Sequence, residues 1–279
     1  MELGFIDLAF DVLASCESES LDEYGDVDQT IMMTLSKITQ NYYQGYEKVR
    51  KVLKYMVDEF ISIYASEANS PNNFQPDTMY AGYLVEICYD ILDSISSMIE
   101  TGRANAVEDI MSHKRCDQFL SILVKVYGNK IEILNRINQN PLTEEQFFNY
   151  VALIYEEVNK LSHVICSLLN NDGTAYHLTS KGILKVMDAS LRNLLLIPST
   201  AERNDVLHSF IIMMSNLFGD YETSDLICDK MFKETKLADI IFDHFLFKVP
   251  DRALLKTLAK DLSYLINNLS ETDDPWCLD

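Results

Sequence analysis

The chain has 279 residues, and its 23 Lys and Arg against 43 Asp and Glu give a formal net charge of −20 at pH 7. General nucleic-acid and anionic-membrane binders need an excess of basic residues, so this charge excludes both classes. Hydrophobic residues make up 48% of the chain and charged residues 24%. This balance is typical of a folded protein with a sizeable core and excludes a disordered or fibrous chain.

Residues 1–28 are predicted to form an N-terminal helix and an acidic loop. Six Asp and Glu lie within positions 17–28, and because like charges repel we expect a solvated segment there. Residues 1–4 lack the basic start of a signal peptide, and no stretch approaches the roughly 18 consecutive apolar residues of a membrane helix. We therefore expect a cytoplasmic or nuclear protein that does not bind membranes.

Helical periodicity dominates the rest of the chain. In residues 49–61 the apolar positions recur at steps of three and one, which places them on one face of a helix. These positions are Val49, Val52, Leu53, Met56, Val57, Phe60 and Ile61. The same period returns in residues 84–95, 119–137, 151–169 and 254–269, and a sustained alternating strand pattern is absent. The sequence therefore predicts an all-α protein.

Turn signals separate these periodic runs. Clusters of Pro, Gly, Asn, Ser and Asp predict turns at residues 70–73, 139–141, 170–173, 197–199 and 249–251. Thr143 and Gln146 have the spacing of a capping box, in which each side chain satisfies an exposed amide at the start of a helix. The helix containing residues 147–169 is therefore expected to begin there.

Sequence motifs of enzymes and metal sites are missing from the chain. It contains no paired Glu-x-x-His motifs, phosphate-binding glycine loop or Gly-x-Ser-x-Gly motif. The six cysteines are widely spaced without a Cys-x-x-Cys pair, so we expect reduced thiols and no zinc: Cys16, Cys88, Cys116, Cys166, Cys228 and Cys277. We predict a non-enzymatic protein without cofactors. A helical enzyme with an unrecognised site is the alternative from another class.

His163 and Cys166 lie three residues apart, as a thiol and its base would on one helix, but packing in a helical core is the favoured interpretation. Residues 191–195 match a Leu-x-x-Leu-Leu peptide and are also assigned to a packed helix. A basic run opposite the apolar face of residues 49–61 is interpreted as a solvated surface, with a site for phosphate or an acidic partner as the alternative. It consists of Lys48, Arg50, Lys51 and Lys54.

One window has a more specific pattern. A long apolar helix ends in Ser215-Asn216-Leu217, and a turn at Gly219-Asp220, a short helix and a second apolar helix at residues 237–245 follow it. This order resembles one armadillo repeat of the importin-α and β-catenin families. It returns around residues 84–123 and 151–196, and residues 254–269 match the third helix of a last repeat. The resemblance implies a right-handed α-solenoid over residues 29–270, followed by an acidic tail at 271–279.

The resemblance also implies a concave face lined by the third helices, where the family places ladders of Asn and Trp. The positions equivalent to the Asn ladder are Ser97, Leu168, Asn216 and Asn268. Those equivalent to the Trp ladder are Asp93, Val164, Ile212 and Tyr264. Loss of every Trp departs from the family's pattern and argues against recognition of a classical nuclear localisation signal.

These features together predict a protein-binding adaptor or scaffold. A partner segment, either a helix or an extended peptide, would lie along the concave face and present apolar and basic side chains. Carboxylates near that face are available for Lys and Arg of the partner: Asp93, Glu157, Asp205 and Asp261. An import adaptor or chaperone for a basic protein is the runner-up. Trp276 in the acidic tail is a candidate docking residue, and a disordered tail is the alternative.

Overall fold

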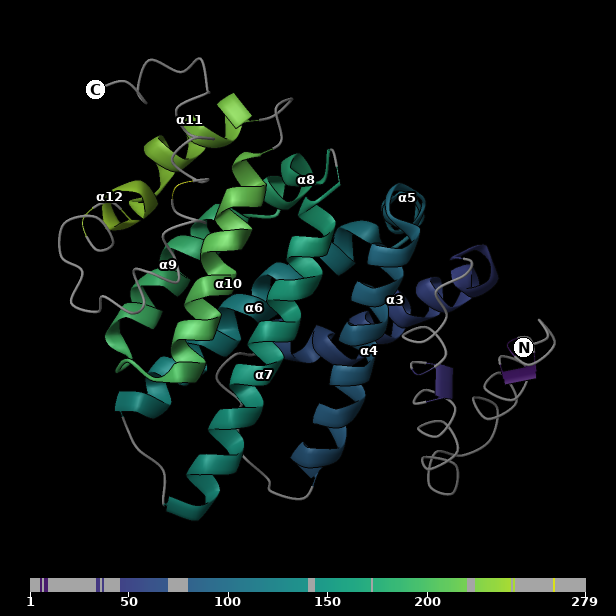
Figure 1. The fold of residues 1–279 in the computed structure, drawn as a ribbon, viewed down its shortest axis with the longest axis horizontal. Coiled ribbons are helices and arrows are strands. Elements are labelled where there is room, and N and C mark those ends of the chain that lie inside the picture. The colour runs from purple at the N-terminus through teal and green to yellow at the C-terminus, as the bar shows by residue number, and fades with distance from the viewer. Residues whose placement is uncertain are drawn as a thin grey trace. The chain divides into compact units, whose positions relative to one another are not determined.

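The computed structural model describes residues 46–69, 80–139, 144–171, 173–219 and 224–241, with single residues at positions 6, 8, 9, 34, 35, 37, 243 and 263. This part of the chain is helical and contains no strand, which confirms the all-α prediction (Figure 1). The acidic loop and the tail predicted at either end lie outside it. None of the described helices has both the length and the apolar character needed to cross a membrane.

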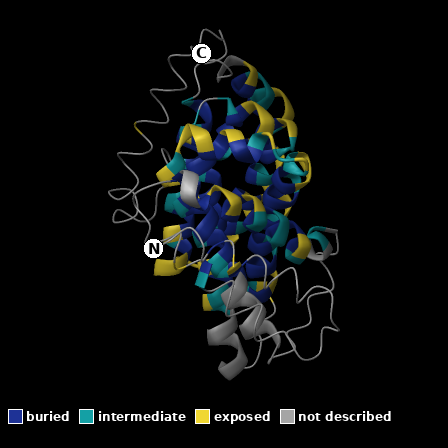
Figure 2. Ribbon diagram, turned by 90° about the vertical axis from the view of Figure 1, so that its right-hand side faces the viewer, coloured by how far each residue is buried: buried dark blue, intermediate teal, exposed yellow. Residues whose placement is uncertain are grey.

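The chain divides into two compact units, residues 1–119 and residues 120–279. The single repeat domain proposed for residues 29–270 stays a prediction. Among the described helices, buried residues lie mainly on the inner faces and exposed residues lie mainly on the outer faces (Figure 2).

The first unit is built on helices α3 (Tyr46–Asn69), α4 (Tyr80–Gly102) and α5 (Ala104–Met111), each of which contacts the other two. The seven apolar residues of the predicted face on α3 are at most 2% exposed, which confirms that prediction. Among them, the Phe60 ring packs against Tyr64 and Phe119 with centroid distances of 4.7 and 5.2 Å. Burial of this face removes its apolar side chains from water, which stabilises the unit.

A buried carboxylate joins α5 to α3. Asp109, only 2% exposed at its side chain, accepts hydrogen bonds from Arg50 Nε at 2.6 Å and Nη2 at 2.5 Å, and from the Tyr46 hydroxyl at 2.6 Å. Burial alone would raise the pKa of Asp109, but these hydrogen bonds and the charges of Arg50 and Lys54 hold it below its usual value. Arg50, assigned from sequence to a solvated basic face, is half-exposed and makes this internal contact.

The corner between α4 and α5 needs glycine at position 102. A Cβ atom there would lie 2.6 Å from the ring of Tyr46, which is closer than real side-chain contacts allow. The next residue, Arg103, has φ of 46° and turns the chain into α5. Tyr46 therefore contacts the end of α4 through its ring and α5 through its hydroxyl.

Replacing Asp109 by Asn should destabilise the protein by about 2 kcal/mol at neutral pH, less than the ~3–5 kcal/mol for fully buried pairs because Arg50 is half-exposed. Since the pKa of Asp109 is lowered on folding, its contribution is complete above about pH 4 and disappears as pH falls further. Urea unfolding should show wild type and Asp109→Asn converging in acid. Glu108 is the exposed residue next to Asp109 on α5, and the control variant Glu108→Gln should keep a stability near that of wild type. Equal stability of Asp109→Asn and wild type at neutral pH would contradict this account.

Helix α6 (Cys116–Gln139) begins in the first unit and continues into the second. The second unit continues with α7 (Glu144–Leu169), α8 (Thr174–Ser180), α9 (Ile183–Leu196), α10 (Ala201–Phe218), α11 (Ser224–Glu234) and α12 (Leu237–Ile241). The longest of these, α7, packs along α10 (Figure 1).

Two of the predicted turns are confirmed in the second unit. Gly173, before α8, has φ of 82°, a left-handed conformation that favours glycine. Residues 197–200 interrupt the helices between α9 and α10. The start of α7 at Glu144 fits the predicted cap, but Thr143 itself lies outside the described residues.

Three contacts set the position of α6 in the second unit. The Lys130 ammonium lies 2.8 Å from the Glu157 carboxylate of α7, and both side chains are buried. Asn135 donates a hydrogen bond of 2.9 Å to Asn193 of α9. Gly128 allows the close approach of α6 and α9, because a Cβ there would lie 2.8 Å from a methyl group of Val186. Each contact requires one register between α6 and its neighbour.

Candidate functional site

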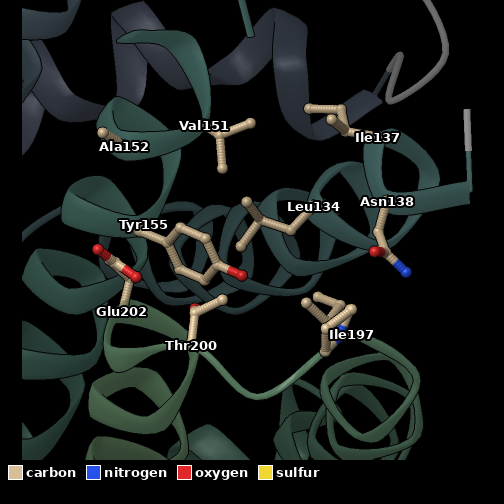
Figure 3. A pocket seen from close by; sticks show the side chains of 10 residues that line it. Leu134, Ile137, Asn138, Val151, Ala152, Tyr155, Ile197, Thr200 and Glu202 are labelled. Carbon is tan, nitrogen blue, oxygen red and sulfur yellow. The ribbon is translucent and has the colours of Figure 1, made fainter. Parts of the chain in front are cut away.

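The second unit contains an open pocket of about 340 Å³ between the end of α6, the middle of α7 and the connection from α9 to α10 (Figure 3). Most of its wall is aliphatic, and its polar groups come from four residues. The lining residues are Leu134, Ile137, Asn138, Val151, Ala152, Tyr155, Ile197, Pro198, Thr200 and Glu202.

The connection between α9 and α10 forms one wall because proline ends the helix there. The residue before a proline avoids the helical conformation, and Ile197 is extended with ψ of 136°. Asn138 donates a 3.4 Å hydrogen bond to the Leu196 carbonyl, and buried Arg203 donates a 3.1 Å bond to the Leu194 carbonyl. These bonds satisfy carbonyl groups at the end of α9 and hold the wall in place.

The polar side of the pocket is organised around Tyr155 and Thr200, which face one another in Figure 3. Burial raises the pKa of Tyr155, a hydrogen bond with the Thr200 side chain opposes the increase, and the nearby Glu202 carboxylate adds to it. Tyr155 is therefore a neutral phenol at physiological pH. Thr200 also caps α10, since its hydroxyl oxygen accepts a 3.2 Å hydrogen bond from the Arg203 amide.

The composition of the wall indicates what the pocket can hold. Its volume lies near the lower end of the roughly 300–1,000 Å³ of ligand sites, and its aliphatic wall suits an apolar group. Glu202 is exposed and supplies a carboxylate at the edge of the pocket. Among the described residues, no His, Cys, Asp and Glu come together in a group of three or more that would suit a metal ion.

Two residues predicted for the concave face are in the core. Val164 and Leu168 of α7 are both 0% exposed, so they cannot contact a ligand in this packing. Their equivalence to exposed ladder positions is therefore wrong. Glu157, expected to pair with a basic partner, is also buried and forms its ion pair with Lys130.

The remaining predicted site residues are accessible or lie beyond the described residues. Ile212 and Asn216 are partly exposed, and their spacing of four residues places them on one side of α10. Asp93 and Ser97 of α4 are also partly exposed, and Asp205 of α10 is exposed. Outside the described residues are Tyr264, Asn268, Asp261 and Trp276.

The structure also shows the environment of the His163–Cys166 pair, the Leu-x-x-Leu-Leu match and the other cysteines. Burial raises the pKa of the Cys166 thiol to about 12, and His163 is exposed, so the thiol stays protonated at physiological pH. Leu191 and Leu194 are 0% exposed in α9, which confirms the core interpretation of the Leu-x-x-Leu-Leu match. Cys88, Cys116 and Cys228 are thiols in the structure, as Cys166 is.

The sequence does not predict the pocket as a site. The turn at residues 197–199 was recognised, and Val151 and Tyr155 lie four apart on the helical face assigned to packing. No local signal brings these segments together with Ile137 at the end of α6. The pocket depends on contacts between segments that are distant in sequence.

The chain matches no protein-family model, and a search of curated proteins also finds no match. The resemblance to armadillo repeats therefore stays a prediction that depends on the residues quoted for it.

Replacing Thr200 by Ala should destabilise the protein by about 1–2 kcal/mol, because α10 loses its cap and Tyr155 loses a hydrogen-bond partner. Thr200→Ser retains the hydroxyl and should stay close to wild type. Chemical unfolding of the three proteins measures the difference. If Thr200→Ser and Thr200→Ala lowered the stability equally, the contacts of the hydroxyl group would not be responsible for the loss.

Proposed function

We propose that this protein is a non-enzymatic adaptor that binds a segment of another protein, and that the pocket of the second unit receives an apolar side chain of that segment. The observation that carries the proposal is an open aliphatic pocket with a polar side. Protein interfaces concentrate their binding energy where one large side chain fills such a pocket. The protein would act by bringing this partner to another component.

The surroundings of the pocket favour a macromolecular partner. Leu196, next to Ile197 of the pocket wall, is 63% exposed. An exposed apolar residue next in sequence to the pocket wall adds to the surface that a partner can cover. Ala152 and Pro198, two residues of the pocket wall, are also exposed. The pocket therefore opens to the surface, where a protruding side chain can enter it.

We also propose an armadillo-like, right-handed α-solenoid as the architecture. It is supported by the order of helices α7, α8, α9 and α10, with 26, 7, 14 and 18 residues. A long helix, a short one, an intermediate one and a second long helix follow each other in the order predicted for a repeat. Packing of α7 along α10 also suits consecutive third helices. In this proposal, Ile212 and Asn216 remain candidates for a second contact surface.

Affinity capture from native cells, followed by mass spectrometry, tests the adaptor role with three altered proteins. Ala152→Phe fills the mouth of the pocket, Ile212→Arg with Asn216→Asp changes the exposed side of α10, and truncation after Ser270 removes the tail with Trp276. We expect a reproducible partner that is lost from Ala152→Phe. Glu108→Gln, an exposed substitution in the first unit, should retain it.

Pro198→Arg provides a second pocket variant, because this wall residue is exposed and its replacement need not disturb the core. Circular dichroism and thermal unfolding establish that each variant is folded. A partner that survives both pocket substitutions and is lost with the α10 pair or with the tail would reject the pocket as the anchor site. Absence of any reproducible partner would reject the adaptor function.

A further inference from the structure

We infer that the pocket recognises a bulky apolar side chain with Lys or Arg beside it in the sequence of the partner. This inference rests on the proposed function and specifies the chemistry of the segment that the protein binds. It is drawn from the aliphatic wall, the carboxylates beside it and the charge of the whole chain.

The apolar part of the motif follows from the size and lining of the pocket. About 340 Å³ bounded by Leu134, Ile137, Val151 and Ile197 provides aliphatic contact for a large side chain. A bulky aromatic or aliphatic group gains the most from leaving water in such a space. Tyr155 is a neutral phenol, and Glu202 forms no salt bridge with another described residue of the second unit, so an apolar ligand does not have to break an ion pair to enter.

The basic part of the motif follows from two carboxylates on α10. Glu202 lines the pocket and Asp205 is three residues further along, so that both lie on the same side of the helix. Both residues are exposed, and neither forms a salt bridge with another residue in the described part of the second unit. A neighbouring residue in a partner peptide lies within about 4 Å of the anchor residue along the chain, which brings its long basic side chain within reach of Glu202.

Net charge decides among the possible occupants. A second copy of this chain would bring together two molecules of formal charge −20, and residues 271–279 would bring an acidic tail to an acidic edge. Like charges oppose both arrangements. A basic partner is attracted both by Glu202 and by the overall charge, and this attraction accelerates association at low salt.

A short peptide provides the direct test. Fluorescein-labelled Gly-Ser-Ala-Arg-Trp-Arg-Ala-Ser-Gly is titrated with the full chain, and binding is followed by fluorescence anisotropy. Three matched peptides have Ala in place of Trp, Glu in place of both Arg, or the original residues in scrambled order with the two Arg distant from Trp. The same titrations are made with Ala152→Phe, Glu202→Gln and Glu108→Gln.

We expect saturable binding of the first peptide to wild type. Replacing Trp in the peptide or introducing Ala152→Phe should weaken binding by about tenfold or more, since the anchor or its space is lost. Glu202→Gln should weaken it by about threefold and reduce its dependence on salt, as expected for an exposed ion pair. Glu108→Gln changes the net charge by the same amount as Glu202→Gln but lies in the first unit, so it should have no effect on binding.

The outcomes separate this inference from the proposed function. Binding that requires Trp and is blocked by Ala152→Phe, yet ignores Glu202→Gln and the exchange of Arg for Glu, would overturn the basic part of the motif and leave the adaptor function standing. Binding that ignores the loss of Trp would overturn the apolar anchor. Absence of binding up to about 1 mM peptide would overturn the inference as a whole.

Discussion

The buried ion pair between Lys130 and Glu157 is the constraint on which the second unit depends. Burial of either charge alone would be costly, so the two side chains must meet and α6 must take one register against α7. That register determines which residues of the following turns, Leu134 and Ile137, face the pocket. Asn135 and Gly128 likewise require one register between α6 and α9. The end of α9 leads into residues 197–200, which supply another part of the pocket lining.

Basic residues are scarce in this chain, and several are used inside it. Arg50 binds buried Asp109, Lys130 binds Glu157, and Arg203 is buried against the end of α9. The chain has 23 basic and 43 acidic residues, and each of the two ion pairs uses one of either kind, so the excess of acidic side chains remains. This excess, together with Glu202 in the pocket lining, favours a basic partner at the pocket.

The helical period was sufficient to predict the all-α class and the buried face of α3. The spacing that places apolar residues on one side of a helix can be seen within a short segment of sequence. Pro198 likewise predicted the break before α10. The same period could not tell whether Val164 and Leu168 face a ligand or the core, since an apolar side suits both. The pocket was missed because the spacing between α6, α7 and residues 197–200 depends on Lys130–Glu157 and other long-range contacts.

Intermolecular nuclear Overhauser effects between the tryptophan ring of the Arg-Trp-Arg peptide and the methyl groups of the full chain show directly whether the ring occupies the pocket. Selective methyl labelling of Ile, Leu and Val reports on the pocket and on α10 in one experiment. We expect contacts from the ring to Ile137, Val151 and Ile197, and none to Ile212. Contacts to Ile212 in place of the pocket methyl groups would contradict it.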